Sequence, residues 1–249
     1  MDGDVAARAR DWHHAMQAAV CDVFEPWAHG TVLRATRYPS YFDFNVVRVE
    51  EAPAMSVDAL VAFADEVLAG LAHRRVDFDL LTAAEPFRSE FEAKGWRALR
   101  LLWMRHDAPA PRAPDMPVEE VSYDLVHDLR VAWHREDFPD QDPGSYHAQA
   151  REVALRRNVK VLALREHGAP VAFAQLERDG EAAEITQVYV SPEHRGRGRG
   201  AAMTHAAIEA AGDVRDLWIA ADDEDRPKHL YARLGFRPAW AAMEFLRLP

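Results

Sequence analysis

The hydrophobic pattern of the first half alternates between helical and strand-like periods. Apolar residues fall on one helical stripe from Val5 to Val20, and a second stripe follows Ser56, which is placed to cap its helix. Residues 41–49 are β-rich, and apolar and polar residues alternate at 76–80. This half therefore predicts a helix, strands, a helix, a strand, a helix and a strand, in that order.

The second half combines two helical segments with a series of short strands. Helical patterns cover 125–136 and 145–157, and another helix ends near Ala211. Strand patterns are expected at 118–121, 159–165, 170–176, 183–190 and 216–220. Asp179-Gly180 separates two of these strands and is a strong hairpin signal. We expect an α/β (α+β) fold in which a mixed, mostly antiparallel sheet is flanked by helices.

A proline-rich stretch between residues 105 and 118 divides the chain, since proline disfavours helix and favours extended backbone. We place a linker at 107–117 between domains of residues 1–106 and 118–249. The two domains end alike, because residues 91–97 and 231–237 match at a constant offset of 140 positions. An internal duplication is the first hypothesis for this match.

Composition narrows the possible partners. The 249 residues carry 30 basic and 41 acidic side chains, and the net charge of −11 argues against a nucleic-acid binder. Apolar stretches are far shorter than the roughly 20 residues that cross a bilayer, so no membrane partner is expected. The single Cys21 excludes an internal disulfide and favours a cytoplasmic location. His134 and His147 lack a third ligand, which predicts no metal. The oligomeric state is left open, with a homodimer as one option.

The segment 195–201 joins the strand that ends at Val190 to the next helix, and it is rich in glycine and arginine. Glycine permits positive φ, so several backbone N–H groups can face one phosphate, while the helix dipole and arginines add positive potential. We expect a phosphate or pyrophosphate ligand. An RGG-like RNA segment fits an acidic chain poorly. Gly196, Gly198 and Ala201 also fit a dinucleotide fingerprint, but a hairpin precedes their strand and one βαβ unit follows it.

In this context, Arg195-x-x-Gly198-x-Gly200 resembles the signature Q/R-x-x-G-x-G/A of the GNAT superfamily of N-acetyltransferases. Residues 230–236 resemble a late motif of the same family. The whole chain resembles a tandem GNAT protein with a degenerate first half, because residues 50–57 lack glycine and carry two glutamates, and Phe91 stands where the second half has Tyr231. We expect the first half to be structural.

The resemblance implies an N-acetyltransferase that moves an acetyl group from acetyl-CoA to a primary amine in a direct ternary complex. It implies a V-shaped opening between the fourth and fifth strands, where the pantetheine arm pairs with the backbone of Val188, Tyr189 and Val190. The residues expected at the pyrophosphate are Arg195, Gly196, Arg197, Gly198, Arg199, Gly200 and Ala201.

Two side chains are candidates for proton transfer. Tyr231 resembles the general acid of the family, which protonates the departing thiolate. Glu184 lies four residues before Val188, where some members place a catalytic base, and the even spacing predicts that it shares a strand face with Val188 and Val190. Bound water is the alternative base. Glu224 replaces an asparagine that is common in relatives, which puts one expected cofactor contact in doubt.

The acceptor is expected to be a small-molecule or peptide amine. The resemblance implies that the first two helices of the second half shape its site, and Trp133, Glu136 and Asp137 at their junction would suit a cationic amine. Two other functions stay open at this point. One is a module that binds acyl-CoA without turnover, and the other is a nicotinamide-dependent oxidoreductase.

Overall fold

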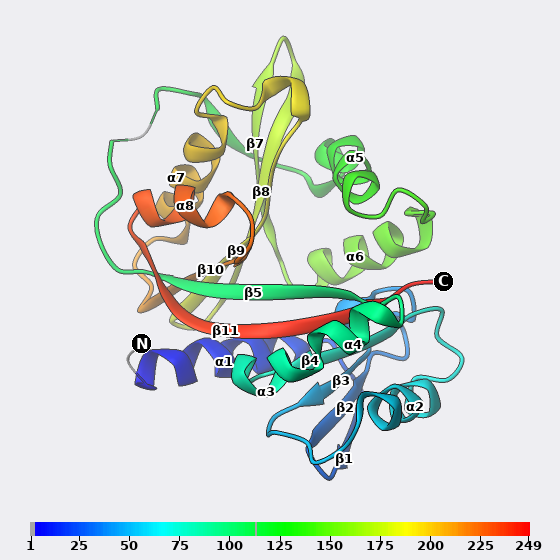
Figure 1. Cartoon of the computed structure of the whole chain (residues 1–249). Helices are drawn as coiled ribbons and strands as arrows, with labels where there is room; N and C mark the ends of the chain where they lie inside the picture. The colour runs from blue at the N-terminus through cyan, green and yellow to red at the C-terminus, as the bar shows by residue number, and fades with distance from the viewer. Residues whose placement is uncertain (1–2, 113) are drawn as a thin grey trace. The chain divides into compact units, whose positions relative to one another are not determined.

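The computed structural model describes residues 3–112 and 114–249, which form two compact units (Figure 1). Unit 1 comprises Met1–Trp103, Asp222–Glu224 and Ala239–Pro249, and unit 2 comprises Met104–Ala221 and Asp225–Pro238. The end of the chain thus belongs to unit 1, whereas the division by sequence assigns it to 118–249. The linker at 107–117 stays a prediction. Its residue 113, like residues 1 and 2 of the predicted first domain, lies outside the described residues.

Unit 1 is built from a β-sheet and several helices. Its elements are α1 (Gly3–Ala18), β1 (Val23–Trp27), β2 (Gly30–Arg34), β3 (Val46–Val49), α2 (Val57–Val67), β4 (Arg74–Phe78), α3 (Leu81–Ala84) and α4 (Arg88–Ala93). Strands β1, β2 and β3 pair antiparallel in succession, and β3 pairs parallel with β4. Ser56 caps α2 as predicted, accepting a hydrogen bond from the Ala59 N–H. The strand predicted at 41–49 begins only at Val46, after a 3-10 turn.

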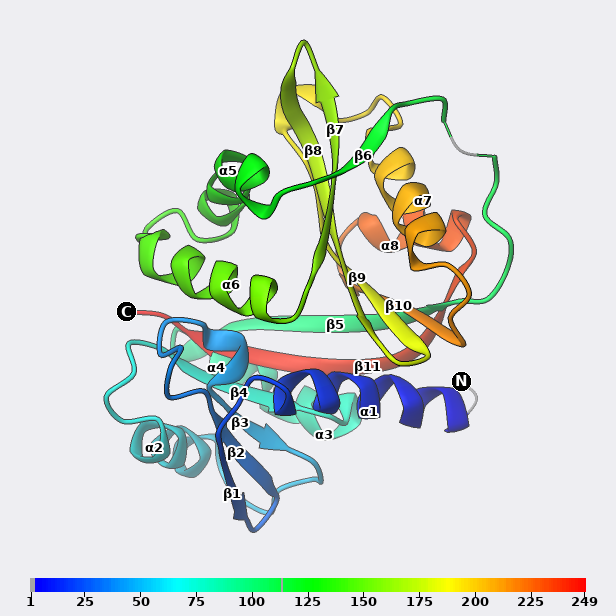
Figure 2. The ribbon, with the colours of Figure 1, turned by 180° about the vertical axis from the view of Figure 1, so that it is seen from behind.

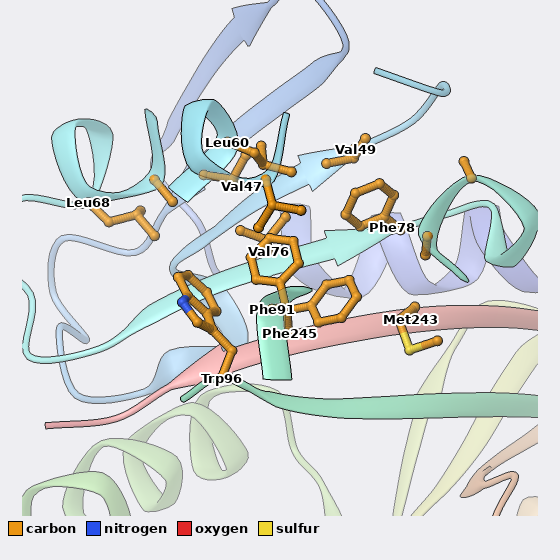
Figure 3. Packing of buried hydrophobic residues seen from close by; sticks show 14 of the residues in the cluster. Val47, Val49, Leu60, Leu68, Val76, Phe78, Phe91, Trp96, Met243 and Phe245 are labelled. Atoms are coloured by element: carbon orange, nitrogen blue, oxygen red, sulfur yellow. The ribbon is translucent and has the colours of Figure 1, made fainter. Parts of the chain in front are cut away.

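The C-terminal strand completes the sheet of unit 1. β11 (Phe236–Arg247) pairs antiparallel with β4, with Met243 opposite Phe78. This pairing places Phe245 in the core, where its ring stacks on Phe91 at 4.2 Å between centroids (Figure 3). Phe91, the counterpart of Tyr231, is therefore a core residue. β5 (Arg97–His106) contributes residues to both units.

A buried charge network joins β11 to β4. The Arg75 guanidinium lies 2.6 Å from Asp43, 2.8 Å from Asp77 and 2.8 Å from Glu244. One buried cation thus faces three carboxylates. Burial, reinforced by the negative charges of Asp77 and Asp43, raises the pKa of Glu244 to about 8. Glu244 is therefore mostly protonated at neutral pH in the folded protein.

Glu244→Gln is expected to flatten the pH dependence of stability. The unfolded chain loses the Glu244 proton near its ordinary pKa, whereas the folded protein keeps it until about pH 8, so the free energy of unfolding falls as pH rises between these values. The slope is at most about 1.4 kcal/mol per pH unit for one proton. Urea unfolding across this range measures it. Equal slopes for the wild type and the variant would contradict the assignment.

Unit 2 is a sheet covered on both faces. Its elements are β6 (Val118–Val121), α5 (His127–Asp137), α6 (Gly144–Arg156), β7 (Lys160–Glu166), β8 (Ala169–Asp179), β9 (Ala182–Val190), α7 (Arg199–Ala211), β10 (Asp216–Asp222) and α8 (Pro227–Arg233). β6 to β9 pair antiparallel in succession, and β9 pairs parallel with β10. Helix α7 lies on one face of β7–β9, and α5 and α6 lie on the other (Figures 1 and 2).

The predicted mixed α/β fold is confirmed. So is the hairpin at Asp179-Gly180, because Asp179 pairs with Ala182 across the turn and Gly180 has a φ of 56°. Both halves also follow one order of elements, in which a strand, a helix and a second, parallel strand come in succession (β3–α2–β4 and β9–α7–β10). No helix within the described residues has the length and apolar character to cross a bilayer.

Candidate active site

Strands β9 and β10 are paired along only about half of their length. Parallel pairing joins Asp216–Ile219 of β10 to Ala182–Ile185 of β9 and ends there, although β9 continues to Val190. On that side, no other described strand of unit 2 pairs with residues 186–190. Their backbone groups form an open edge to which an extended ligand could add as a strand.

A β-bulge interrupts β9 at this opening. Tyr189 pairs with Phe173 and Thr186 with Gln175, so that Gln187 and Val188 together face the single Ala174. Gln187 has a φ of 53°, in the left-handed region. The extra residue shifts the alternation of side chains beyond it by one position.

The bulge overturns the expected placement of Glu184. Glu184 pairs with Glu177, on the same face of β8 as Phe173, and therefore shares a face with Tyr189. Val190 pairs with Ala172 and lies on the opposite face. The prediction that Glu184 and Val190 share a face was wrong, because even spacing places residues together only in a regular strand. Glu184 itself is half-buried and has interaction partners in the protein.

Unpartnered backbone donors cluster in the glycine-rich loop. The N–H groups of Arg195 and Ala202 donate to Pro192 and Gly198 at 3.2 and 3.0 Å. Between them, the N–H groups of residues 196–201 find no acceptor within the described chain. The first N–H groups of a helix lack intrahelical partners, and here the preceding loop adds further donors. The loop therefore offers a concentration of donors suited to an anion.

Backbone conformation in this loop depends on glycine. Gly196 and Gly198 have φ values of 77° and 78°, which other residues adopt at a cost. A side-chain carbon at Gly200 would lie 3.3 Å from Leu230 of α8 and 4.0 Å from Val190, so this glycine allows close packing between the loop, α8 and the end of β9. The glycines thus fix both the shape of the loop and its distance from β9.

The three arginines of the loop have different surroundings. Arg195 donates to the Val190 carbonyl at 2.9 Å and to Glu136 at 2.7 Å. Arg199 is buried, and its Nε donates to Glu166 at 2.7 Å while another nitrogen donates to the His194 carbonyl. Arg197 is exposed and has no ion-pair partner among the described residues. Arg195 and Arg199 stabilise the loop through these hydrogen bonds. Arg197 is the arginine of the loop that is best placed to bind an anion.

Arg197→Gln is expected to raise the Kd of a bound diphosphate ligand about 10-fold with unchanged stability, because one exposed charge-assisted contact contributes about 1.4 kcal/mol. Arg199→Gln is the matched variant in the same loop. It leaves Glu166 without its buried partner and should lower the melting temperature. Calorimetric titration with acetyl-CoA and thermal unfolding separate the two effects. Equal Kd values for the wild type and Arg197→Gln would remove Arg197 from the site.

Tyr231 is buried on α8, one residue after the Leu230 that packs toward Gly200. Burial, with a smaller contribution from the negative charge of Asp225, raises the pKa of the Tyr231 phenol above its ordinary value. The hydroxyl therefore keeps its proton at neutral and moderately alkaline pH. A protonated phenol can act as a proton donor.

The residues expected at the acceptor site have partners of their own. Trp133 packs against the core of unit 2. Glu136 accepts a hydrogen bond from the Tyr189 hydroxyl at 2.5 Å in addition to that from Arg195. Although partial burial opposes it, these hydrogen bonds hold the pKa of Glu136 below its usual range. Asp137 is exposed at the end of α5. Glu136 thus fastens α5 to the end of β9.

Glu224, where the resemblance implies an asparagine, belongs to unit 1. Its two carboxylate oxygens accept from the Arg88 guanidinium at 2.6 and 2.9 Å. The neighbouring Asp223 pairs with Arg100 at 2.9 Å. These acidic residues therefore serve structural ion pairs. No group of three His, Cys, Asp or Glu side chains that could hold a metal ion is found in the described ranges.

Sequence reasoning missed a buried polar cluster between α5, α6 and β8–β9. Arg130 of α5 is only 1% exposed, and its guanidinium lies over the Tyr123 ring at 4.6 Å and donates to the Gln187 side chain. His134 and His147 are buried in the same region. Arg130 and His134 occupy consecutive turns on one side of α5, a spacing that could have indicated an inward-facing polar pair.

The open edge of β9 and the donor-rich loop agree with the result of sequence comparison. The profile of the Acetyltransferase (GNAT) family matches residues 123–236, which include β9, the loop and α8. This part of the chain therefore matches the GNAT family, whose description is that of acetyltransferases.

One relative is similar in sequence, and two solved structures are similar in fold. An uncharacterized N-acetyltransferase of Methanocaldococcus jannaschii is 31% identical over 93 residues, which cover 33% of this chain and 41% of that protein. A conserved protein of unknown function from Staphylococcus epidermidis has a similar fold, with a TM-score of 0.67, 16% identity and coverage of 92% and 94% of the two chains. A GCN5-related N-acetyltransferase from Kribbella flavida gives a TM-score of 0.56 at 19% identity over 98% and 96%.

Proposed function

We propose that this GNAT protein transfers an acetyl group from acetyl-CoA to a primary amine in a direct ternary complex. The observation that carries the proposal is the set of unpartnered N–H groups at residues 196–201, which directly follows the open edge of β9. A diphosphate with an extended, amide-containing arm is the ligand whose chemistry fits both features. The loop offers donors to the diphosphate, and the backbone of Val188, Tyr189 and Val190 offers hydrogen bonds to the arm.

The reaction joins a neutral amine to the thioester carbonyl carbon. The new C–N bond forms, the C–S bond breaks, and the nitrogen loses a proton to a base while the departing thiolate gains one. In our proposal Tyr231 supplies the proton to the sulfur, supported by its burial and raised pKa. Glu184 or a bound water accepts the proton from the amine. Alkylamines with a pKa near 10 are mostly protonated at neutral pH, so the ammonium form must also lose a proton before the amine can attack.

A thiol-release assay tests the proposal. Purified protein with acetyl-CoA is mixed with pooled primary amines, both small molecules and peptides, and free CoA is measured. We expect saturable binding of acetyl-CoA and thiol release with at least one pool. Binding without release from any amine would favour a module that senses acyl-CoA. Stabilisation by NADH and not by acetyl-CoA would favour an oxidoreductase.

We place the enzyme in the cytoplasm, which the single, buried Cys21 supports. Its partners are the amine acceptor and acetyl-CoA, with no nucleic acid or membrane, and a homodimer stays an option. Gel filtration with light scattering measures the oligomeric state.

A further inference from the structure

The Arg130 guanidinium is a buried charge without a counter-ion in the described chain. It lies over the rings of Tyr123 and Phe173, at 4.6 and 5.9 Å, and it donates a side-chain hydrogen bond to the neutral amide oxygen of Gln187. Ring faces and an amide offset only part of the cost of burying a cation, and buried charges are normally paired. Such a site is suited to an anion that is supplied from outside.

Other polar atoms around Arg130 also lack hydrogen-bond partners. Gln175 and Thr186 pair across β8 and β9, and their Nε2 and Oγ1 atoms are buried without a partner, as is Arg130 Nε. On the helical side, His134 and His147 lie 5.3 Å apart between ring centroids and carry unpartnered ring nitrogens. Buried polar groups are rarely left unsatisfied in folded proteins, so a concentration of them points to a ligand.

The chemistry of these atoms selects the ligand. Arg130 Nε and Gln175 Nε2 can only donate hydrogen bonds, and the Thr186 hydroxyl can also donate. An ammonium group, itself only a donor, could use only the Thr186 hydroxyl among them, and the positive charge of Arg130 would repel it. A carboxylate accepts several hydrogen bonds and neutralises the guanidinium, with which it forms paired hydrogen bonds. Burial and the charge of Arg130 lower the pKa of His147 to about 4, so this histidine adds no second positive charge at neutral pH.

The position of the cluster connects it to the reaction. Gln187 is the bulge residue next to Val188, and its side chain is half-buried at the open edge of β9. Its amide oxygen now occupies the place that a carboxylate oxygen would take on Arg130. We propose that Arg130 binds the carboxylate of the acceptor, so that the acceptor is an amine that also carries a carboxylate, such as an amino acid or a short peptide. This inference rests on the proposed acetyl transfer.

The test compares matched acceptors on the full-length protein. One pool contains L-amino acids and dipeptides, and the other contains the same compounds as C-terminal amides. Amides have the less basic amine, so the comparison is biased against the proposal. We expect kcat/KM for the acids to exceed that for the amides by about 30-fold or more, as for loss of one partner of a buried charge pair.

Two variants test the residue itself. Arg130→Met removes the charge. Gln187→Glu instead supplies an internal carboxylate to Arg130, so it tests the proposal even if Arg130→Met does not fold. Both should bring the ratio of acid to amide activity close to one with little change in the Kd of acetyl-CoA. Arg156→Met, an exposed arginine on α6, is the control and should keep the wild-type ratio.

Other outcomes overturn the inference. An acid-to-amide ratio near one in the wild type, an unchanged ratio in Arg130→Met, or acetylation only of amines without a carboxylate would each do so and leave acetyl transfer intact. Absence of acetyl-CoA binding, or of thiol release from every amine, would overturn the proposed function as well. The binding measurement thus separates the two failures.

Discussion

Tyr231→Phe is expected to lower kcat by about 100-fold, because positioned proton transfer contributes at least this factor. The hydroxyl is the only group that the substitution removes, and the buried ring keeps its packing against Phe236. Because burial raises the pKa of this phenol, kcat should show no loss from its ionisation through moderately alkaline pH. Steady-state kinetics of thiol release and calorimetric titration with acetyl-CoA give the two parameters.

The Kd of acetyl-CoA should change little in this variant, which separates a role in the transition state from a role in binding. Tyr38→Phe is the matched control, since Tyr38 is a buried tyrosine of unit 1, and its kcat should equal that of the wild type. A wild-type kcat in Tyr231→Phe would show that the thiolate obtains its proton elsewhere.

Gly198→Val is expected to raise the Kd of acetyl-CoA by about 100-fold. The backbone of Gly198 has a φ of 78°, which a β-branched residue does not adopt without strain. A side-chain carbon at this position has room, since the nearest atom is a Met116 carbon at 3.7 Å, so the strain is in the backbone. Relief of that strain would redirect the N–H groups, and losing two charge-assisted hydrogen bonds costs roughly 3 kcal/mol.

Gly168→Val is the control for this variant. Gly168 lies in the turn between β7 and β8 with a φ of 86° and nothing near its would-be side chain, so the same substitution imposes a similar backbone strain away from the loop. Both variants should lose some stability, but only Gly198→Val should bind acetyl-CoA more weakly. Equal Kd values in the two would contradict the role of the loop.

Much of the fold could be predicted because local signals dominate it. The strands of unit 2, its hairpin at Asp179-Gly180 and the helix after Gly198 follow from periodicity and turn residues. The pairing of β11 with β4 could not be predicted, since it joins residues more than 160 positions apart and depends on a register that only the packed core decides. The strands β1 and β2 were also missed, and in β1 Glu25 and Pro26 interrupt the apolar alternation.

The site was predictable as a backbone feature and less so as a set of side chains. Glycine spacing alone located the donor-rich loop. The roles of Arg195 and Arg199 depend on Glu136 and Glu166, which are distant in sequence and reach them only in the folded chain. Which residues share a strand face with Glu184 depends on one inserted residue, Gln187, and no residue type in the sequence indicates this insertion. Arg130 was missed because a single arginine within a helix usually faces solvent.

The most direct measurement is the electron density of a crystal grown with acetyl-CoA. We expect diphosphate oxygens within about 3.2 Å of several backbone nitrogens of residues 196–201, with the pantetheine arm alongside Val188–Val190. Density for the coenzyme at another place, or a loop in which these nitrogens donate to the protein itself, would contradict this expectation.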